Sequence, residues 1–270
     1  MKFRAYFLVI LLILAVKASF SQDNGSPYRT SFKVDAPIIV GGLGLSYLGF
    51  TMIKDKDPLT EAEVASLSKS DVNFLDRGIA GNFSKRADDA SYTPFYASFA
   101  MPVVMLLNKN VGRHAGQVLT LYGETMAITG ALYTLTAGAV NRPRPLVYDS
   151  NADIGKKMSK NSQRSFFAGH TAATAAATFL TAKVFGDLNP DSRAKPYVWA
   201  AAAVIPASVG YLRMKAGQHF ITDNIVGYAI GAGTGILVPQ LHKRLNNTNL
   251  SIAPARVFGE QGLMVTYDLK

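Results

Sequence analysis

The 270-residue sequence contains no cysteine, which excludes a disulfide framework, a thiolate nucleophile and a metal site built on sulfur. Histidine is scarce, and any imidazole chemistry must come from His114, His170, His219 or His242. The net charge is +10, yet no long run of basic residues of the kind found in nucleic-acid-binding arms occurs. The basic residues lie between apolar segments, which suits anionic lipid head groups or phosphate substrates and predicts no nucleic-acid partner.

The N terminus has the layout of a secretory signal peptide. The basic start MKFR precedes the apolar run YFLVILLILAV, and Ser19 and Ser21 then supply the small residues typical of a cleavage site. We predict cleavage near Ser21 and a location in a bacterial-type cell envelope. An uncleaved membrane anchor is the alternative interpretation, although the apolar run is short for a membrane span.

Six apolar segments follow, and several approach the roughly 20 residues that cross a bilayer. None shows the alternation of a strand, so helices are expected over residues 36–53, 92–107, 117–140, 169–185, 197–212 and 221–241. Small residues recur at every fourth position, as in Gly227, Gly231 and Gly235, and such faces allow membrane helices to pack closely. We predict an all-α, membrane-embedded bundle of five or six helices. Because mean hydropathy is only +0.13, a soluble helical periplasmic domain is the alternative.

The composition divides the chain into four parts: a signal peptide over 1–21, an N-terminal segment with a polar connector over 22–91, the catalytic helical bundle over 92–241, and a C-terminal tail over 242–270. In the connector, Thr60 and Glu63 are spaced to form a capping box. The tail contains LSIAPAR and GLMVTYDL separated by GEQG, which predicts a small β-hairpin.

Three polar clusters lie at ends of apolar segments: NRPRP at 141–145, SFFAGHT at 165–171, and LRMKAGQHFITDN at 212–224. Each alone is typical of an ordinary helix end. Together they could converge on one anion, because arginines match phosphate oxygens, one histidine can attack phosphorus and another can protonate the leaving oxygen. If a helix covers His219 and Asp223, their spacing of four places them on one face, where the carboxylate can accept the imidazole proton.

The order and spacing of these clusters resemble the type 2 phosphatidic acid phosphatase superfamily, with its pattern K-x6-R-P, then P-S-G-H, then S-R-x5-H-x3-D. The similarity covers about residues 92–241. It implies a helical-bundle fold shared with vanadium haloperoxidases and a reaction without a metal or other cofactor. It also implies that His219 is the nucleophile, that Asp223 orients it, that His170 is the general acid, and that the phosphate is bound by Arg144, Arg213 and Gly169.

The sequence departs from this pattern at several positions. Ala137 stands where the pattern has lysine, Phe167 and Ala168 replace the Pro-Ser pair, and Leu212 replaces the serine before Arg213. Loss of one preorganised donor typically costs about 10² to 10³ in rate, so we expect Ala137 and Ala168 to reduce activity. Arg142 is a candidate auxiliary cation for the missing charge, and an exposed cation at a helix end is its other interpretation.

The function predicted from these features is hydrolysis of a phosphate monoester or diphosphate end of a lipid through a phosphohistidine. By resemblance, the candidate substrates are an isoprenoid diphosphate, phosphatidic acid, phosphatidylglycerol phosphate and a lipid A phosphate. One alternative is a weakened or silent relative that acts as a membrane lipid-binding or scaffold protein; another is a vanadate-dependent haloperoxidase. We expect the site to face the periplasm, which requires residues 36–53 to lie in the membrane interface and leaves five spans.

Overall fold

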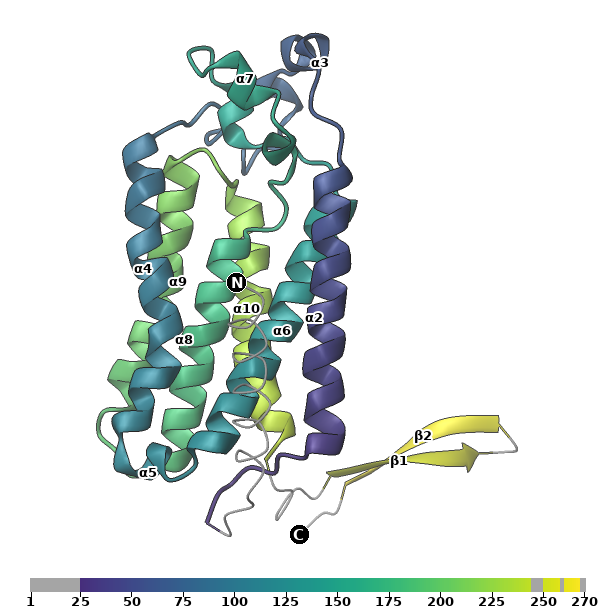
Figure 1. Ribbon diagram of the computed structural model, residues 1–270, viewed down its shortest axis with the longest axis vertical. Helices are drawn as coiled ribbons and strands as arrows, with labels where there is room; N and C mark the ends of the chain where they lie inside the picture. Colours follow the sequence, from purple (N-terminus) through teal and green to yellow (C-terminus); the bar gives the residue numbers. More distant parts are fainter. Residues whose placement is uncertain (1–24, 244–249, 258–259, 268–270) are drawn as a thin grey trace, which may run out of the picture.

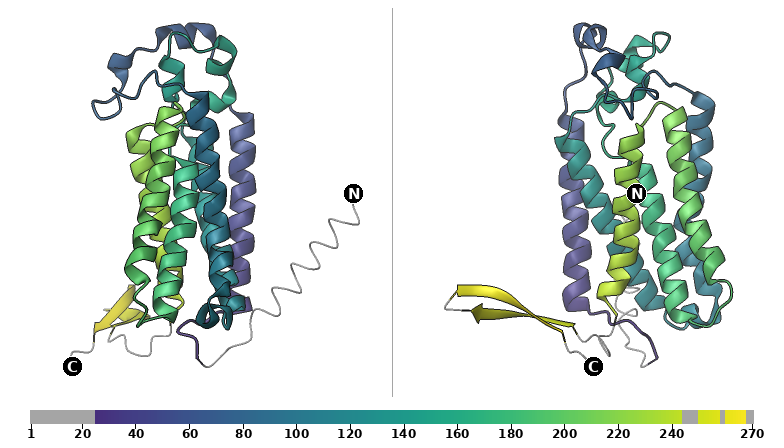
Figure 2. Two further views of the ribbon diagram at one scale, coloured as in Figure 1. Left: turned by 90° about the vertical axis from the view of Figure 1, so that its left-hand side faces the viewer. Right: turned by 180° about the vertical axis from the view of Figure 1, so that it is seen from behind.

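The computed structural model describes residues 25–243, 250–257 and 260–267, so the predicted signal peptide lies outside the described residues. Six long helices run up and down in one bundle (Figures 1 and 2). They are α2 (Phe32–Asp55), α4 (Lys85–Val104), α6 (Ala115–Ala139), α8 (Gly169–Leu188), α9 (Lys195–Lys215) and α10 (Ile221–Leu241). The predicted all-α bundle is confirmed.

Short helices connect the long ones. A cap at the upper end of the bundle in Figure 1 contains α3 (Glu61–Ser66), η1 (Lys69–Asp71), η3 (Pro145–Tyr148), α7 (Ile154–Lys157) and η4 (Lys160–Gln163). At the lower end, η2 (Met105–Leu107) and α5 (Lys109–Gly112) join α4 to α6. The predicted capping box begins α3: Glu63 N–H donates to Thr60 Oγ1 at 3.2 Å, and Thr60 N–H donates to Glu63 Oε2 at 2.7 Å.

Helix α8 occupies the centre of the bundle and contacts α4, α6, α9 and α10. Its alanines face the glycines of α10 so closely that no side chain fits between the two backbones. A Cβ on Gly231 would lie 2.1 Å from the Ala172 carbonyl oxygen, and a Cβ on Gly235 would lie 2.6 Å from the Ala176 carbonyl oxygen. The small-residue spacing in the sequence therefore corresponds to a direct helix contact.

Helix α2 packs against α6 along its length. A Cβ on Gly42 would lie 3.0 Å from the backbone of Ala127, and a Cβ on Gly49 would lie 2.4 Å from the backbone of Thr134. The opposite face of α2 exposes large apolar side chains. Because α2 runs beside α6 from one end of the bundle to the other, the expected placement of residues 36–53 in the membrane interface is not supported.

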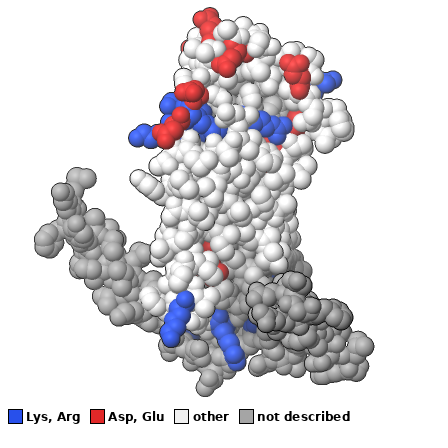
Figure 3. All heavy atoms as spheres, turned by 90° about the vertical axis from the view of Figure 1, so that its right-hand side faces the viewer, with Lys and Arg blue, Asp and Glu red and all other residues white. Residues whose placement is uncertain are grey.

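Three helices in the described part of the chain are long and apolar enough to cross a membrane: Phe32–Asp55, Lys85–Leu107 and Ile221–Leu241. Figure 3 shows charged side chains gathered at the two ends of the bundle and a broad, nearly uncharged band between them. A lipid bilayer accommodates such a band because apolar side chains need no water there. These features support an integral membrane protein.

An ionic cluster joins three helices at the end of the bundle where α2 begins. His242 Nε2 lies 3.2 Å from Asp35 Oδ1 and 3.3 Å from Glu124 Oε2. The other ring nitrogen, Nδ1, donates to the Val238 carbonyl at 2.8 Å. The carboxylates of α2 and α6 are thereby held against the end of α10.

The tail contains two strands, β1 (Leu250–Val257) and β2 (Glu260–Tyr267). They pair antiparallel, with Leu250 opposite Tyr267 and Val257 opposite Glu260.

Substitution of Gly231 by leucine tests the contact between α8 and α10. We expect Gly231→Leu to lower stability by about 3 kcal/mol or more, because the added side chain must displace the Ala172 backbone. The matched control is Gly233→Leu in the same helix, since a Cβ at Gly233 has no atom within 4 Å. The melting temperatures of the two purified variants are the measurement, and equal values would contradict this packing.

Candidate active site

The three polar clusters meet at the capped end of the bundle, the upper end in Figure 1. Backbone hydrogen bonds join them: Ser165 N–H donates to Arg142 O at 3.1 Å, and Ala168 N–H donates to Asp223 O at 3.0 Å. Leu146 N–H donates to the carbonyl of residue 217 at 3.0 Å. Backbone hydrogen bonds alone therefore hold segments that are distant in the sequence against one another.

His219 is buried, with 1% of its surface exposed. Its Nδ1 lies 2.6 Å from the Ser165 carbonyl oxygen. A carbonyl can only accept, so Nδ1 carries the proton and Nε2 carries the lone pair. Burial, with the charges of Arg144 and Arg213, holds the pKa of His219 well below its usual range, so the imidazole is neutral at pH 7. The ring is therefore prepared to act as a nucleophile through Nε2.

Asp223 is not the direct hydrogen-bond partner of His219. Helix α10 begins at Ile221, so His219 precedes the helix and the two side chains do not share a helical face as expected. The Asp223 carboxylate accepts from Ser165 Oγ at 2.5 Å and from Phe220 N–H at 2.8 Å. Ser165 therefore links them, because its hydroxyl donates to Asp223 and its carbonyl accepts from His219.

Arg142 is committed to carboxylates. Its Nη2 lies 2.7 Å from Asp76 Oδ2, and its Nη1 pairs with Asp223 and donates to Thr222 Oγ1 at 3.0 Å. The guanidinium carbon also lies 4.8 Å from the centre of the Phe220 ring. Arg142 therefore braces the start of α10 and has no terminal nitrogen left over for the role of auxiliary phosphate-binding cation.

Asp76 belongs to the polar connector and is fully buried. It accepts from Thr222 N–H at 3.0 Å and from Thr222 Oγ1 at 2.6 Å. Burial raises the pKa of Asp76, but the hydrogen bonds from Thr222, Asn73 and Arg142 outweigh it and lower the pKa. The connector thus contributes an ionised carboxylate that fixes Arg142.

Arg144 is 3% exposed, and its side chain makes no hydrogen bond or ion pair with any residue that the structure describes. Burial lowers the pKa of Arg144 to about 9, against the opposing effect of Tyr133, so the group stays charged at pH 7. Arg213 is 2% exposed, and its Nη1 donates to Asp88 Oδ1 at 2.6 Å and to Ser91 Oγ at 3.3 Å. Both arginines keep donors free for an anion.

His170 lies in the first turn of α8, with its ring centre 4.4 Å from Phe95 and 5.6 Å from Tyr92. Burial and the charges of Arg213 and Arg144 lower the pKa of His170 to about 3. The charges of Arg144, Arg213 and His170 also act on His219. The structure therefore brings together the four basic side chains singled out in the sequence.

Gly169 opens α8 directly against an aromatic ring. A Cβ at this position would lie 2.6 Å from the Tyr133 ring. The close approach of Tyr133 explains why this position, proposed to bind phosphate, needs a residue without a side chain.

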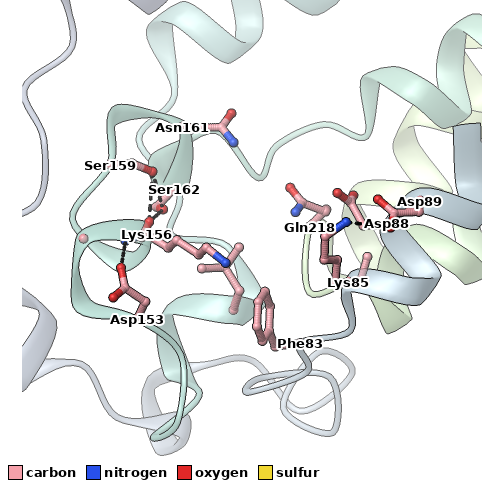
Figure 4. A pocket seen from close by; sticks show the side chains of 13 residues that line it. Phe83, Lys85, Asp88, Asp89, Asp153, Lys156, Ser159, Asn161, Ser162 and Gln218 are labelled. Carbon is pink, nitrogen blue, oxygen red and sulfur yellow. Dashed lines mark hydrogen bonds and ion pairs between the residues drawn. The ribbon is translucent and has the colours of Figure 1, made fainter.

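A pocket of about 440 Å³ borders this group of residues (Figure 4). Figure 4 shows Lys85, Asp88 and Asp89 on one side, and Asp153 and Lys156 on the other. The pocket adjoins the histidines and arginines because Asp88 binds Arg213 and because its lining residue Gln218 precedes His219. It offers polar and charged groups of both signs beside the proposed reaction centre.

Sequence reasoning missed Asp76, Arg164 and Ser165. The Arg164 Nε is shielded from solvent without a hydrogen-bond partner, and its charge acts on Arg144 and His170. The sequence shows Arg164 only as one of several cations in a basic loop. A metal-like grouping among the described residues, formed by the Asp35–Glu124–His242 cluster, lies at the opposite end of the bundle.

Arg142→Gln tests the bracing role of Arg142. Removing its charge leaves Asp76 and Asp223 buried without their cation, so we expect stability to fall by about 3 kcal/mol. The matched control is Arg86→Gln, at an exposed position on the same end of the bundle. Chemical or thermal unfolding of both variants is the measurement; a stability of Arg142→Gln equal to that of the control would refute this role.

Residues 118–247 match the family model of the PAP2 superfamily, and this range includes all three clusters. No curated protein matches the chain. A crystal structure of a transmembrane PAP2-type phosphatidylglycerolphosphate phosphatase from Bacillus subtilis is similar, with 18% identity and a TM-score of 0.44 over 78% of this chain and 96% of that chain. Over residues 118–247, this chain is therefore similar to the PAP2 superfamily.

Proposed function

We propose that this protein hydrolyses the phosphate monoester or diphosphate end of a lipid through a phosphohistidine intermediate, without a metal ion. The match of residues 118–247 to the family model of the PAP2 superfamily supports a phosphoric ester hydrolase that acts on lipid phosphates. The observation that carries the proposal is the position of His219. Its Nε2 lone pair lies in the field of Arg144, a buried guanidinium that no described residue neutralises.

In the first step, His219 Nε2 attacks phosphorus. The bond from phosphorus to the leaving oxygen breaks, and His170 passes a proton to that oxygen. Because burial and the charges of Arg213 and Arg144 lower the pKa of His170 to about 3, the imidazole takes this proton from the bound phosphate monoanion. Arg144 and Arg213 bind the phosphoryl oxygens, where their charge counts most because water is excluded. The ring of His219 becomes positively charged when the nitrogen–phosphorus bond forms, and its Nδ1–H continues to donate to the Ser165 carbonyl.

In the second step, water attacks the phosphohistidine. Neutral His170 accepts a proton from that water, the nitrogen–phosphorus bond breaks, and inorganic phosphate leaves with His219 restored. Asp223 supports this cycle through Ser165, which it holds by a hydrogen bond from the hydroxyl. Asp223 is thus a positioning residue in this proposal.

A silent or weakened relative that binds lipid is the second candidate function. It is favoured by Ala137, which is fully buried and supplies no charge where the family pattern has lysine. Such a protein would share the fold and bind phosphorylated lipid without turnover.

His219→Ala separates the two functions. We expect wild-type protein to release phosphate from at least one member of a panel containing an isoprenoid diphosphate, phosphatidic acid, phosphatidylglycerol phosphate and a lipid A phosphate. We expect the variant to lose this activity by about 10³-fold or more, because the nucleophile is absent. Vanadate should inhibit the wild type by occupying the phosphate position.

The control for this experiment is His114→Ala, which removes an imidazole outside the three clusters. Equal phosphate release by wild type and His219→Ala would overturn the phosphohistidine mechanism. A wild type that binds these lipids and releases no phosphate from any of them would favour the silent relative.

A periplasmic active site remains a prediction. This orientation requires residues 36–53 to lie in the membrane interface and not to span the membrane. Helix α2 packs along the whole bundle and has the length of a span, so that basis is weakened. With the predicted signal cleavage, a spanning α2 would instead bring the site to the cytoplasmic face.

Because the chain has no cysteine, a single introduced thiol reports the orientation without background. Asn151 is exposed in the cap and suits the substitution Asn151→Cys. A periplasmic site predicts that a membrane-impermeant maleimide labels this variant in intact cells. Labelling only after permeabilisation would place the site in the cytoplasm, and Asp191→Cys, at an exposed turn at the other end of the bundle, should then show the reverse pattern.

A further inference from the structure

We propose that Arg164 binds the phosphoryl group of the substrate and takes the place of the lysine that the family pattern puts at position 137. This inference rests on the proposed phosphatase function and identifies a further residue of the same site. Its basis is an uncompensated charge: a guanidinium beside the histidines and arginines that finds no acceptor in the described part of the protein.

Helix α6 does not supply the positive charge of the missing lysine. Ala137 is completely buried within that helix and contributes only a methyl group. Arg142 is the nearest cation in the sequence after α6, and both of its terminal nitrogens bind carboxylates. The replacement cation must therefore come from another segment.

The backbone of Arg164 is fixed beside the first cluster. Residues Arg142 and Arg164 form a parallel bridge, in which Arg142 N–H donates to Gln163 O at 2.9 Å and Ser165 N–H donates to Arg142 O at 3.1 Å. Arg144 N–H donates one step further along, to Ser162 O at 2.8 Å. Arg164 thus sits directly before Ser165, the residue whose carbonyl holds His219.

The side chain of Arg164 has the properties of an anion-binding group. Its Nε is shielded from water without a hydrogen-bond partner, and the side chain forms no ion pair with any described residue. Its charge acts on Arg144 and on His170. The guanidinium groups of Arg144 and Arg164 repel each other and lack hydrogen-bond acceptors. A bound phosphate would neutralise the repulsion and supply the acceptors.

Lys56 is the other cation close to Arg164, and its contacts give it a different role. Its ammonium donates to the Val140 carbonyl at 2.7 Å, where α6 ends. The charges of Lys56 and Arg164 act on each other. Lys56 therefore adds to the positive field around Arg164 while its ammonium stays bound to the Val140 carbonyl. Of these two cations, Arg164 is therefore the one that keeps its donors for substrate.

An arginine at this position has a chemical consequence. The guanidinium presents a planar fork that can bind two phosphoryl oxygens at once, whereas a lysine offers a single point charge. Arg144, Arg164 and Arg213 together would supply three such forks to one phosphate. This arrangement suits a dianionic phosphate monoester or the terminal phosphate of a diphosphate.

The experiment compares Arg164→Ala and Arg164→Lys with wild type. We expect Arg164→Ala to lower kcat by about 10² to 10³-fold on the best lipid phosphate of the panel, and to weaken vanadate inhibition, because a preorganised donor is lost. We expect Arg164→Lys to recover part of the activity. Arg193→Ala, at an exposed turn at the other end of the bundle, is the matched control and should behave as wild type.

Melting temperatures distinguish substrate binding from a structural role. Because Arg164 makes no ion pair in the described structure, Arg164→Ala should melt at the wild-type temperature or above it. A marked fall in melting temperature, with activity that falls in proportion, would overturn the proposal. So would wild-type turnover and vanadate inhibition in Arg164→Ala.

The outcomes also separate this proposal from the proposed function. If His219→Ala is inactive while Arg164→Ala keeps full activity, the phosphatase stands and the role of Arg164 is wrong. If the wild type shows no turnover, vanadate binding measured by calorimetry decides. Equal vanadate affinity of wild type and Arg164→Ala refutes the role of Arg164, and no binding by the wild type refutes both proposals.

Discussion

The buried carboxylate of Asp223 is the contact on which the candidate site depends. It accepts from Ser165 in the second cluster, from Phe220 beside its own helix, and from Arg142 in the first cluster. A buried carboxylate is costly unless several donors and a cation satisfy it, so these segments hold one relative arrangement. This arrangement also fixes the orientation of His219, because the Ser165 carbonyl that accepts its hydrogen bond belongs to a residue held by Asp223.

The charges at this end of the bundle are arranged unequally. Asp76 and Asp223 are satisfied by Arg142, and Asp88 takes one nitrogen of Arg213. Arg144 has no such partner among the described residues. The local carboxylates therefore stabilise the framework, and the region around the two histidines stays positively charged. A positive region of this kind favours binding of a phosphate before the reaction.

The part of the bundle below the site is suited to lipid instead of water as its surroundings. The band between its charged ends exposes apolar side chains, while contacts between helices use glycine and alanine. Within lipid, burial of apolar surface gives little advantage, so close backbone contact must supply the packing energy. The contact of Gly231 with Ala172 on α8 lies in the same pair of helices that carries His170 and Asp223, so bundle packing and site geometry are linked.

The sequence alone determined the helices and the small-residue faces, because segment length, composition and spacing act within one helix. It also identified Arg144, His170, Arg213 and His219, whose residue types and order carry the family pattern. Only the tertiary structure decided that Ser165 stands between Asp223 and His219, that Arg142 is neutralised, that Arg164 is not, and that α2 packs along the whole bundle. The reason is physical: the partners of a loop side chain are set by backbone contacts between distant segments, and spacing along one segment cannot specify them.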